Sequence, residues 1–380
     1  MHILIAPNAF KHSLNAQQAA TAIAEGLLTS RLDCTCECFP IADGGDGTAE
    51  LIIERCKGTQ VEGWVHDPLG REILASFGLI DDGRTAVIEM ANASGIRLLK
   101  PHELNPLMAT SYGTGEQIKL ALDKDVERII IALGGSATVD GACGMLQALG
   151  LRFMDSRGEE LKDLPEALTD LAAVDDSDFD KRILKTEVIV LCDVANRLLG
   201  EHGAAAVFGP QKGASAAGVR KLDEALAKLA AVGLKKTGKD MSTVLSGGTA
   251  GGAAAGLFAF VGAKLVNGID HFLELTGFDE ALEKADLVIT GEGSIDEQTL
   301  QGKGPFGVAR QAKMKLLPVI GLAGKVPSEN NEKLQEYFDA IFAIGNEVLD
   351  LPAALAATAV NLRRIGTELG NLLAFSTKQL

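Results

Sequence analysis

The chain has 380 residues, of which 47% are hydrophobic and only 4% aromatic, and its formal net charge is −15. Its length exceeds what a single core usually reaches, so we expect two domains. The acidic balance argues against nucleic acid as a partner, because a phosphate backbone requires a basic surface. No apolar run is long enough for a membrane span and the first residues lack a signal-peptide pattern, so we expect a cytoplasmic protein.

The six cysteines are too few for a disulfide framework in a chain of this size. Cys34, Cys36 and Cys38 alternate, so on a strand all three would face the same side. A metal site usually needs a fourth ligand and a wider spacing. We therefore interpret these residues as small buried thiols.

The first elements alternate between strand and helix. Residues 3–6 predict a strand, and the next helix is expected to begin at a cap on Ser13 or Asn15. A second strand over 36–41 leads into the segment ADGGDGT (42–48), which opens another helix. Three glycines and two carboxylates within five residues favour a binding site here, although a surface turn could have the same composition.

The pattern changes near residue 59. Segments 61–65, 73–80 and 85–90 alternate in hydrophobicity and are joined by turn residues, which predicts an antiparallel meander. After an apolar strand at 128–133, the segment GGSATVDG (134–141) enters a helix of small residues. Gly, Ser and Thr at a helix start favour anion binding, since backbone N–H groups and the helix dipole point at the ligand.

Three further loops follow in the middle of the chain. A buried strand at 188–191 ends at Asp193, which is a candidate base or metal ligand but could equally cap the next helix. Lys212 lies in the turn GPQKG (209–213). The segment SGGTAGG (246–252) either binds phosphate or allows close helix packing.

The last third returns to alternating strands and helices, and it contains the most informative loop. A strand at 287–290 runs into TGEGSID (290–296), which supplies two glycines with Glu292 and Asp296, and Lys303 follows. Backbone donors, carboxylates and a lysine after a buried strand are what an enzyme acting on phosphate with a metal ion requires. Any one such loop could be an ordinary turn. At least six strands end in loops of this kind, however, and open α/β sheets bind ligands at that edge.

Two nucleotide-binding motifs can be tested directly. The P-loop motif GxxxxGK[ST] does not occur, and Gly302–Gly307 matches GxGxxG only formally, because it does not follow a strand and contains a proline. No Ser-His-Asp or Cys-His set is evident. The remaining combination favours phosphoryl transfer, with Mg²⁺ on carboxylates, lysines and backbone N–H groups on phosphates, and one Asp as the base.

From end to end the chain resembles the type I glycerate kinase family. The resemblance rests on APNAFK, PIADGGDGTAE, DPLGREI, IEMANASG, TSYGTGE, LGGSATVDGACGMLQALG, CDVANRLLGEHGAAAVFGPQKGA, TAGGAAAGL and ITGEGSIDEQTLQGKGPFGVA. It implies phosphorylation of D-glycerate by ATP with Mg²⁺, to 2-phosphoglycerate as in many bacterial members. It also implies an α/β fold, with a Rossmann-like parallel-sheet domain built from residues 1–59 and 284–380. A second, mixed α/β domain would be inserted at 60–283, with the active site in the cleft between the two.

The resemblance also guides the assignment of residues. We expect Asp193 to be the catalytic base, with Asp43 as its rival, and we count Lys11 with the catalytic residues. Glu292 and Asp296 are expected to bind Mg²⁺, directly or through water. The substrate- and phosphate-binding candidates are Gly44, Gly45, Gly134, Gly135, Ser136, Thr138, Lys212 and Lys303.

The chain departs from the family pattern at several positions. Many members have Asp at position 8, where this chain has Asn8. The usual Asn, Thr, Pro and Arg of other motifs are replaced here by Val139, Ala195, Arg197 and Ser294. Polar roles at these positions are therefore not carried over.

Other functions stay open at this stage. A glycerate 3-kinase would have the same fold, because the product depends on how glycerate lies relative to the γ-phosphate. An NAD-linked 2-hydroxyacid dehydrogenase would need a strand-linked GxGxxG and a catalytic His with a carboxylate partner. A non-catalytic sensor would need a DNA- or partner-binding module. We expect D-glycerate and ATP as partners, neither nucleic acid nor membrane, and we allow for a homodimer.

Overall fold

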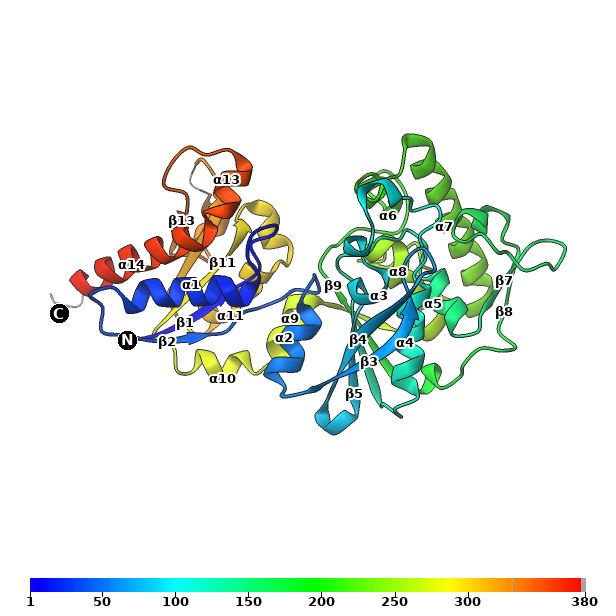
Figure 1. Cartoon of the computed structure of the whole chain (residues 1–380), viewed down its shortest axis with the longest axis horizontal. Helices are drawn as coiled ribbons and strands as arrows, with labels where there is room; N and C mark the ends of the chain where they lie inside the picture. The colour runs from blue at the N-terminus through cyan, green and yellow to red at the C-terminus, as the bar shows by residue number, and fades with distance from the viewer. Residues whose placement is uncertain (330, 377–380) are drawn as a thin grey trace. The chain divides into compact units, whose positions relative to one another are not determined.

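The computed structural model describes residues 1–329 and 331–376 (Figure 1). This part of the chain forms two compact units. Unit 1 contains residues 1–43 and the chain from 269 onward, and unit 2 contains residues 44–268. Each unit has its own sheet, and the α/β class expected from the sequence is confirmed.

The sheet of unit 1 is parallel throughout. Its five strands lie in the order β13-β12-β11-β1-β2, with bounds β1 (His2–Pro7), β2 (Thr35–Cys38), β11 (Leu287–Ser294), β12 (Val319–Lys325) and β13 (Ala340–Ala343). Ile3 is in register with Leu287 and Ile5 with Ile289, so the first strand pairs with one far along the chain. Counted within the unit, the order is 2-1-3-4-5, that of a doubly wound fold whose connections reverse direction between β1 and β11.

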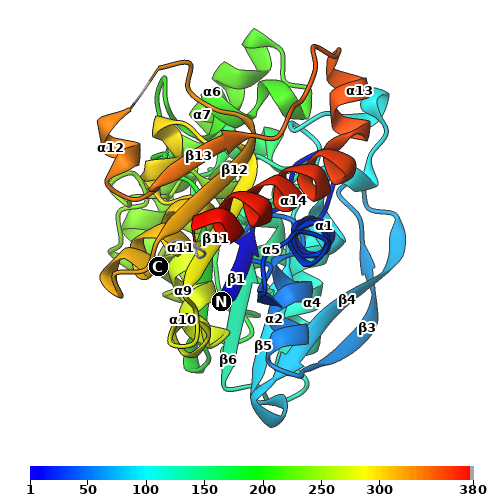
Figure 2. The same ribbon diagram turned by 90° about the vertical axis from the view of Figure 1, so that its left-hand side faces the viewer.

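Helices cover the sheet of unit 1. α1 (Ala16–Leu28) begins at Asn15, whose Oδ1 accepts from Gln18 N at 2.8 Å while Gln18 Oε1 accepts from Asn15 N at 3.1 Å. This capping box confirms Asn15 rather than Ser13 as the cap. α1 packs beside α14 (Thr358–Ser376), as Figure 2 shows. The other helices are α9 (Gly268–Leu275), α10 (Phe278–Leu282), α11 (Gly304–Met314), α12 (Glu332–Gln335) and α13 (Leu351–Ala356).

Unit 2 is built on a mixed six-stranded sheet in the order β10-β9-β6-β5-β4-β3. β3 (Thr59–His66), β4 (Glu72–Ile80) and β5 (Thr85–Glu89) are antiparallel neighbours, so the predicted meander is confirmed. From β5 the sheet continues in parallel through β6 (Arg128–Ala132), β9 (Glu187–Cys192) and β10 (Lys264–Asn267). A separate hairpin is formed by β7 (Arg152–Met154) and β8 (Ala173–Asp175).

The helices of unit 2 enclose its larger core. They are α2 (Thr48–Arg55), α3 (Ala91–Ser94), α4 (Tyr112–Leu122), α5 (Cys143–Ala148), α6 (Ala204–Phe208), α7 (Ala216–Thr237) and α8 (Thr249–Val261). The core combines the aliphatic strands β6 and β9 with small residues of α8, such as Ala253 and Ala254, which allow close packing. No helix in the described residues is both long and apolar enough to cross a membrane.

The limits of the two units differ from the predicted domain limits. α2 lies in unit 2, although the prediction placed residues up to 59 in the first domain, and α10 lies in unit 1, although residues up to 283 were placed in the inserted one. The strand predicted over 36–41 ends at Cys38, although Phe39 N and Ile41 N still donate to Ile5 O and Pro7 O of β1. The domain division at 59 and 284 stays a prediction.

The cysteines next to β2 are only partly buried. Cys34, Cys36 and Cys38 lie against the core of unit 1, and all six cysteines of the chain are free thiols. Burial, followed by the neighbouring Cys34, raises the pKa of Cys36 to about 12, so this thiol is unreactive at neutral pH.

Candidate active site

The polar loops of unit 1 meet where the strand order reverses. The chain leaves β1 at Asn8, whereas β11 continues through Glu292 to Ser294. The two segments remain side by side because Asn8 N donates to Gly291 O at 2.8 Å. Doubly wound sheets bind ligands outside the carboxyl ends of their strands at such a point. Asp43, Glu292 and Lys303, which were predicted from separate segments, come together here.

Asp43 is held in place by two donors. Asn8 Nδ2 donates to Asp43 Oδ2 at 3.0 Å, and Gly304 N donates to the same oxygen at 3.3 Å. Asn8 Oδ1 in turn accepts from Ala9 N at 2.8 Å, which fixes the orientation of the amide. An Asp at position 8 could donate to Asp43 only if it were protonated. Asn8 therefore donates to Asp43 without having to carry a titratable proton, and Asp43 Oδ1 has no hydrogen bond among the described residues.

Glu292 is a buried carboxylate with little hydrogen bonding from its surroundings. Its side chain is 9% exposed, and its nearest donor is Thr299 Oγ1 at 3.5 Å. Burial raises the pKa of Glu292 to about 7; Lys303 opposes this shift and Asp43 adds to it. Asp296 also interacts with it electrostatically from the start of the helical turn Glu297–Gln301, where Asp296 Oδ1 accepts from Gln298 N at 2.9 Å.

This donor set fits a hard divalent cation. Glu292 and Asp296 supply only oxygen atoms, and a positive ion would offset the unfavourable burial of the Glu292 charge. Within the described residues, no group of three or more His, Cys, Asp or Glu side chains could hold a metal ion by itself. Mg²⁺ commonly binds to one or two carboxylates and completes its shell with water and substrate phosphates.

Two lysines accompany these carboxylates. Lys11 is exposed after β1, and Lys303 is half-buried as the residue before α11. Neither forms an ion pair with another residue of the described chain, but both lower the pKa of Glu292. A pocket of about 330 Å³ opens next to Asp296 and is lined by Ser294, Lys325 and others. Lys11 and Lys303 do not line this pocket, but lysines without an ion-pair partner can bind phosphate.

In unit 2, the loop after β6 is organised around a buried lysine. Lys212 is 3% exposed, and its Nζ donates to Ser136 Oγ at 2.8 Å and to Thr138 O at 2.6 Å. Burial lowers the pKa of Lys212 to about 7, against the opposing charge of Asp140. Lys212 therefore holds the 134–141 loop, whereas the sequence suggested that it contacts phosphate.

Asp140 is the strongest acceptor of the same loop, and the sequence did not single it out as a site residue. It is fully buried, and its Oδ2 accepts from Ser111 N at 2.9 Å, from Ser111 Oγ at 2.6 Å and from Gly144 N at 3.3 Å. Its Oδ1 accepts from Ala142 N at 3.2 Å. The N–H groups at the start of α5, where an anion was expected, are thus partly occupied by the protein's own carboxylate.

The glycine loop at 44–48 lies on the glycine loop at 134–135. Gly134 N donates to Gly44 O at 2.9 Å. Gly135 has a φ of +70°, and a Cβ there would collide with Asp46 Oδ1. At Gly134 a Cβ would collide with Gly45 Cα, so only glycine allows this approach of the two backbones. The structure thus brings together the predicted residues Gly44, Gly45, Gly134 and Gly135.

Glu89, at the end of β5, holds the 44–48 loop through hydrogen bonds from backbone N–H groups. Its carboxylate accepts from Gly47 N at 3.0 and 3.1 Å and from Ala49 N at 3.2 Å. Burial raises the pKa of Glu89, and these backbone donors oppose the shift. Sequence reasoning missed this role, although Glu89 directly ends a strand within the segment IEMANASG.

The remaining candidates lie at the same edge of the unit 2 sheet. Asp193 follows β9, whose parallel neighbour β6 leads into Gly134. Thr138 Oγ1 is buried without a partner among the described residues, which leaves a hydroxyl for a ligand to satisfy. The 246–252 loop packs closely, since Gly141 N donates to Gly251 O at 3.0 Å, and this favours its structural interpretation.

The comparisons with known proteins decide the family. The profile of the Glycerate kinase family matches residues 3–374. A Glycerate kinase of Bacillus subtilis is 43% identical over 369 residues, covering 97% of each chain. A Glycerate 2-kinase of Escherichia coli is 41% identical over 378 residues, covering 100% of this chain and 99% of the relative. The chain belongs to the glycerate kinase family. It is therefore an enzyme of the kinase class, as the residues at its strand ends indicated.

A solved structure supports the fold as well. The crystal structure of a Salmonella typhimurium LT2 protein, provisionally named glycerate kinase 2, superposes with a TM-score of 0.83 at 42% identity, with full coverage of both chains. Three of the positions that depart from the family pattern have local explanations. Val139 is a fully buried core residue, Arg197 donates to Thr243 O at 3.1 Å, and Ser294 Oγ donates to Asp296 Oδ2 at 3.3 Å.

Proposed function

We propose that this glycerate kinase transfers the γ-phosphoryl group of ATP to the C2 hydroxyl of D-glycerate and releases 2-phosphoglycerate and ADP. The observation that carries the proposal is the set of carboxylates and unpaired lysines at the point where the unit 1 sheet reverses its order. This is the equipment for positioning phosphates and removing a hydroxyl proton. The name of the Escherichia coli relative supports the 2-position over the 3-position.

The reaction needs one base. An aspartate accepts the proton of the C2 hydroxyl, the freed oxygen forms a bond to the γ-phosphorus, and the bond from that phosphorus to the β,γ-bridging oxygen breaks. Asp193 is our first candidate. Asp43 is its rival, since Asn8 and Gly304 orient one of its oxygens and leave the other available.

The other residues of the unit 1 group would bind charge. Glu292 and Asp296 would hold Mg²⁺, which when bound neutralises the β- and γ-phosphates. Lys303 and Lys11 would contact phosphate oxygens or the glycerate carboxylate, because they lack partners in the described part of the protein. In unit 2, Lys212 and Asp140 would keep the 134–141 loop in shape, so that Ser136 and Thr138 present fixed groups to a ligand.

We also place the enzyme in the cytoplasm. Its free thiols suit a reducing compartment, and its second substrate, ATP, is supplied there. A homodimer stays a prediction, to be checked by light scattering.

The product can be identified by enzyme assays coupled to enolase. ATP consumption is measured with D-glycerate, L-glycerate, glycolate and tartronate, and the product is passed to enolase alone or to phosphoglycerate mutase with enolase. We expect D-glycerate to be the preferred substrate and enolase alone to give phosphoenolpyruvate. A signal that requires the mutase would show the 3-phosphoglycerate alternative. Absence of glycerate-dependent ATP consumption would contradict the proposed function.

The base is identified by matched substitutions. Asp193→Asn and Asp43→Asn remove a proton acceptor with little change of shape. For the true base we expect kcat to fall about 10²–10⁴-fold with ADP binding retained. A larger loss of kcat in Asp43→Asn than in Asp193→Asn would reverse our assignment.

A further inference from the structure

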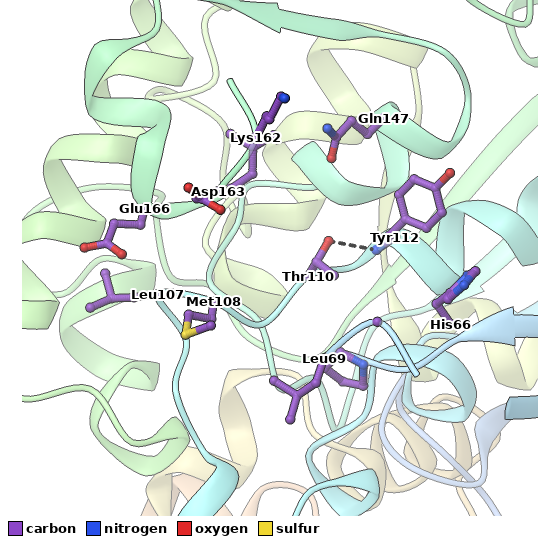
Figure 3. A pocket seen from close by; sticks show the side chains of 13 residues that line it. His66, Leu69, Leu107, Met108, Thr110, Tyr112, Gln147, Lys162, Asp163 and Glu166 are labelled. Atoms are coloured by element: carbon purple, nitrogen blue, oxygen red, sulfur yellow. Dashed lines mark hydrogen bonds between the residues drawn. The ribbon is translucent and has the colours of Figure 1, made fainter. Parts of the chain in front are cut away.

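A pocket of about 630 Å³ in unit 2 has no part in the chemistry described so far (Figure 3). It lies among the turn after β3, the loop before α4, the start of α4, α5 and the loop at 162–166. Two of its walls come from the segments DPLGREI and TSYGTGE. Both segments contribute to the family resemblance, yet neither has received a role above.

The walls of the pocket are held rigidly. Asp67 is 2% exposed, and its Oδ1 accepts from Leu69 N at 2.8 Å and from Arg71 N at 3.0 Å, which fixes the turn. Tyr112 packs edge-on against His66, with ring centroids 6.0 Å apart. His66 Nδ1 is hydrogen-bonded to Glu116 Oε1 at 2.9 Å. A turn and an aromatic ring held in this way are preorganised for a ligand.

The two sides of the pocket differ in chemistry. Figure 3 shows Gln147, Tyr112 and Lys162 along one side, and Leu69, Leu107 and Met108 along the other. The apolar side is unusually open, since Met108 is 63% and Leu69 36% exposed. The side chains of Gln147, Lys162 and Asp163 have no hydrogen-bonding partner within residues 1–329 and 331–376, and neither does the Tyr112 hydroxyl. Such a pocket fits a ligand that is flat and apolar in one part and strongly polar in another.

We propose that this pocket binds a purine nucleotide. The base would lie between the Tyr112 ring and the apolar side, because aromatic side chains and heterocyclic bases stack favourably. The Gln147 amide offers a donor and an acceptor together, which match the adjacent N6 and N7 positions of adenine. Asp163 would accept from the ribose hydroxyls, and the Lys162 ammonium would bind a phosphate.

The pocket is also joined to the loop held by Lys212. Ser111 lies between the pocket residues Thr110 and Tyr112, and both its N–H and its hydroxyl donate to Asp140. Asp140 in turn shapes the start of α5, on which Gln147 lies. A path of hydrogen-bonded residues thus joins the pocket to the 134–141 loop, which carries the phosphate-binding candidates Ser136 and Thr138.

The nucleotide has two sources, which an experiment separates. It is the ATP substrate, in which case the inference rests on the proposed function, or a nucleotide that binds separately and regulates the enzyme. The probe is ADP, titrated calorimetrically into the full-length protein in EDTA, so that binding does not depend on the proposed metal site. The variants are Gln147→Leu, Lys162→Ala and Asp163→Ala. Lys185→Ala, an exposed lysine of the same unit outside the pocket, is the control.

We expect each pocket variant to weaken ADP binding about tenfold or to abolish one ADP site, and the control to leave binding unchanged. Inorganic tripolyphosphate should bind equally to wild type and Gln147→Leu, because it has no base. An unchanged dissociation constant for ADP in all three variants, or no ADP binding by the wild type, would overturn the proposal.

Kinetics then identify the source. A rise in the KM for ATP that matches the loss of ADP affinity assigns the pocket to the substrate. Loss of ADP binding with an unchanged KM for ATP assigns it to a regulatory nucleotide. If glycerate-dependent turnover is absent but the variants still lose ADP, the proposed function fails and the nucleotide site stands.

Discussion

Each unit contains a group of carboxylates and lysines. The two groups have the same residue types but differ in how far their side chains are hydrogen-bonded within the protein. In unit 2, Asp140 accepts from Ser111, Ala142 and Gly144, while Lys212 donates to Ser136 and Thr138. In unit 1, Glu292 has one long hydrogen bond, and Lys11 and Lys303 have no ion-pair partner in the described structure. The unit 2 group is satisfied by hydrogen bonds within its own unit, whereas the unit 1 group contains charged side chains that lack such partners among the described residues.

The difference separates architecture from chemistry. A buried polar group that is fully hydrogen-bonded stabilises one arrangement of its loop. A buried carboxylate that lacks partners costs stability, and it is retained where it binds a ligand. The residue type alone would not distinguish Asp140 from Glu292. Their partners do.

Within this comparison, the largest effect on activity should follow from Glu292→Gln. We expect kcat/KM to fall about 10²–10³-fold, because a group that stabilises charge in the transition state is lost. Glu283→Gln, an exposed change in the same unit, should leave activity unchanged. The assay is initial-rate kinetics at saturating Mg²⁺.

Glu292→Gln also tests whether the buried Glu292 carboxylate lowers the unfolding free energy. The pKa of Glu292 is raised from 4.5 to about 7, so the folded state holds its proton more tightly than the unfolded state over that range. The resulting stability is present below pH 4.5 and lost as the pH rises through about 7. At pH 8 the unfolding free energy of Glu292→Gln should therefore not fall below that of the wild type in urea denaturation. A clear fall would place Glu292 among the structural residues.

An effect of similar size, on stability rather than on chemistry, is expected for Asp140→Ala. The change leaves the N–H groups of Ser111, Ala142 and Gly144 buried without an acceptor, which should cost about 3–5 kcal/mol of unfolding free energy. Asp178→Ala, whose side chain is 72% exposed, is the matched control and should change it by less than about 0.5 kcal/mol. The midpoint of urea denaturation measures both. A loss under about 1 kcal/mol for Asp140→Ala would remove the contrast between the two groups.

The smallest effect is a pH slope from Lys212. Burial lowers the pKa of Lys212 from 10.5 to about 7, so between these values the unfolded state binds a proton that the folded state does not. Stability from this group is therefore present above pH 10.5 and lost as the pH falls through about 7. We subtract the unfolding free energy of Lys212→Met from that of the wild type. This difference should rise between pH 7.5 and 9.5, by up to about 1.4 kcal/mol per pH unit. A flat difference would show that Lys212 stays charged in the folded protein.

The sequence was most informative where local chemistry decides structure. Strands β1, β6, β9 and β11 were predicted from short apolar runs, and the cap of α1 was narrowed to Ser13 or Asn15, of which the structure has Asn15. The proximity of Asp43 and Glu292 was also predictable, since parallel strands end at one edge of a sheet. These inferences need only the period of a pattern and the direction of a strand.

What could not be predicted depends on distant contacts. Lys212 is bonded to Ser136 and Thr138, which are 76 and 74 residues away, so nothing in its own turn indicates that it is buried. The unit to which α2 belongs is decided by the sheet against which it packs, and an amphipathic pattern does not contain that information. The purine pocket is assembled from several segments, none of which looks like a site by itself.

The pairing of β1 with β11 has a consequence for biosynthesis. Ile3 lies beside Leu287, so β1 is synthesised 284 residues before its central neighbour β11. The whole of unit 2 is translated in the interval and can fold while the N-terminal segment is still unpaired on that side. The newly made chain must therefore protect an apolar strand for many seconds during its synthesis. We expect its dependence on chaperones to be set by residues 1–43 rather than by the larger unit.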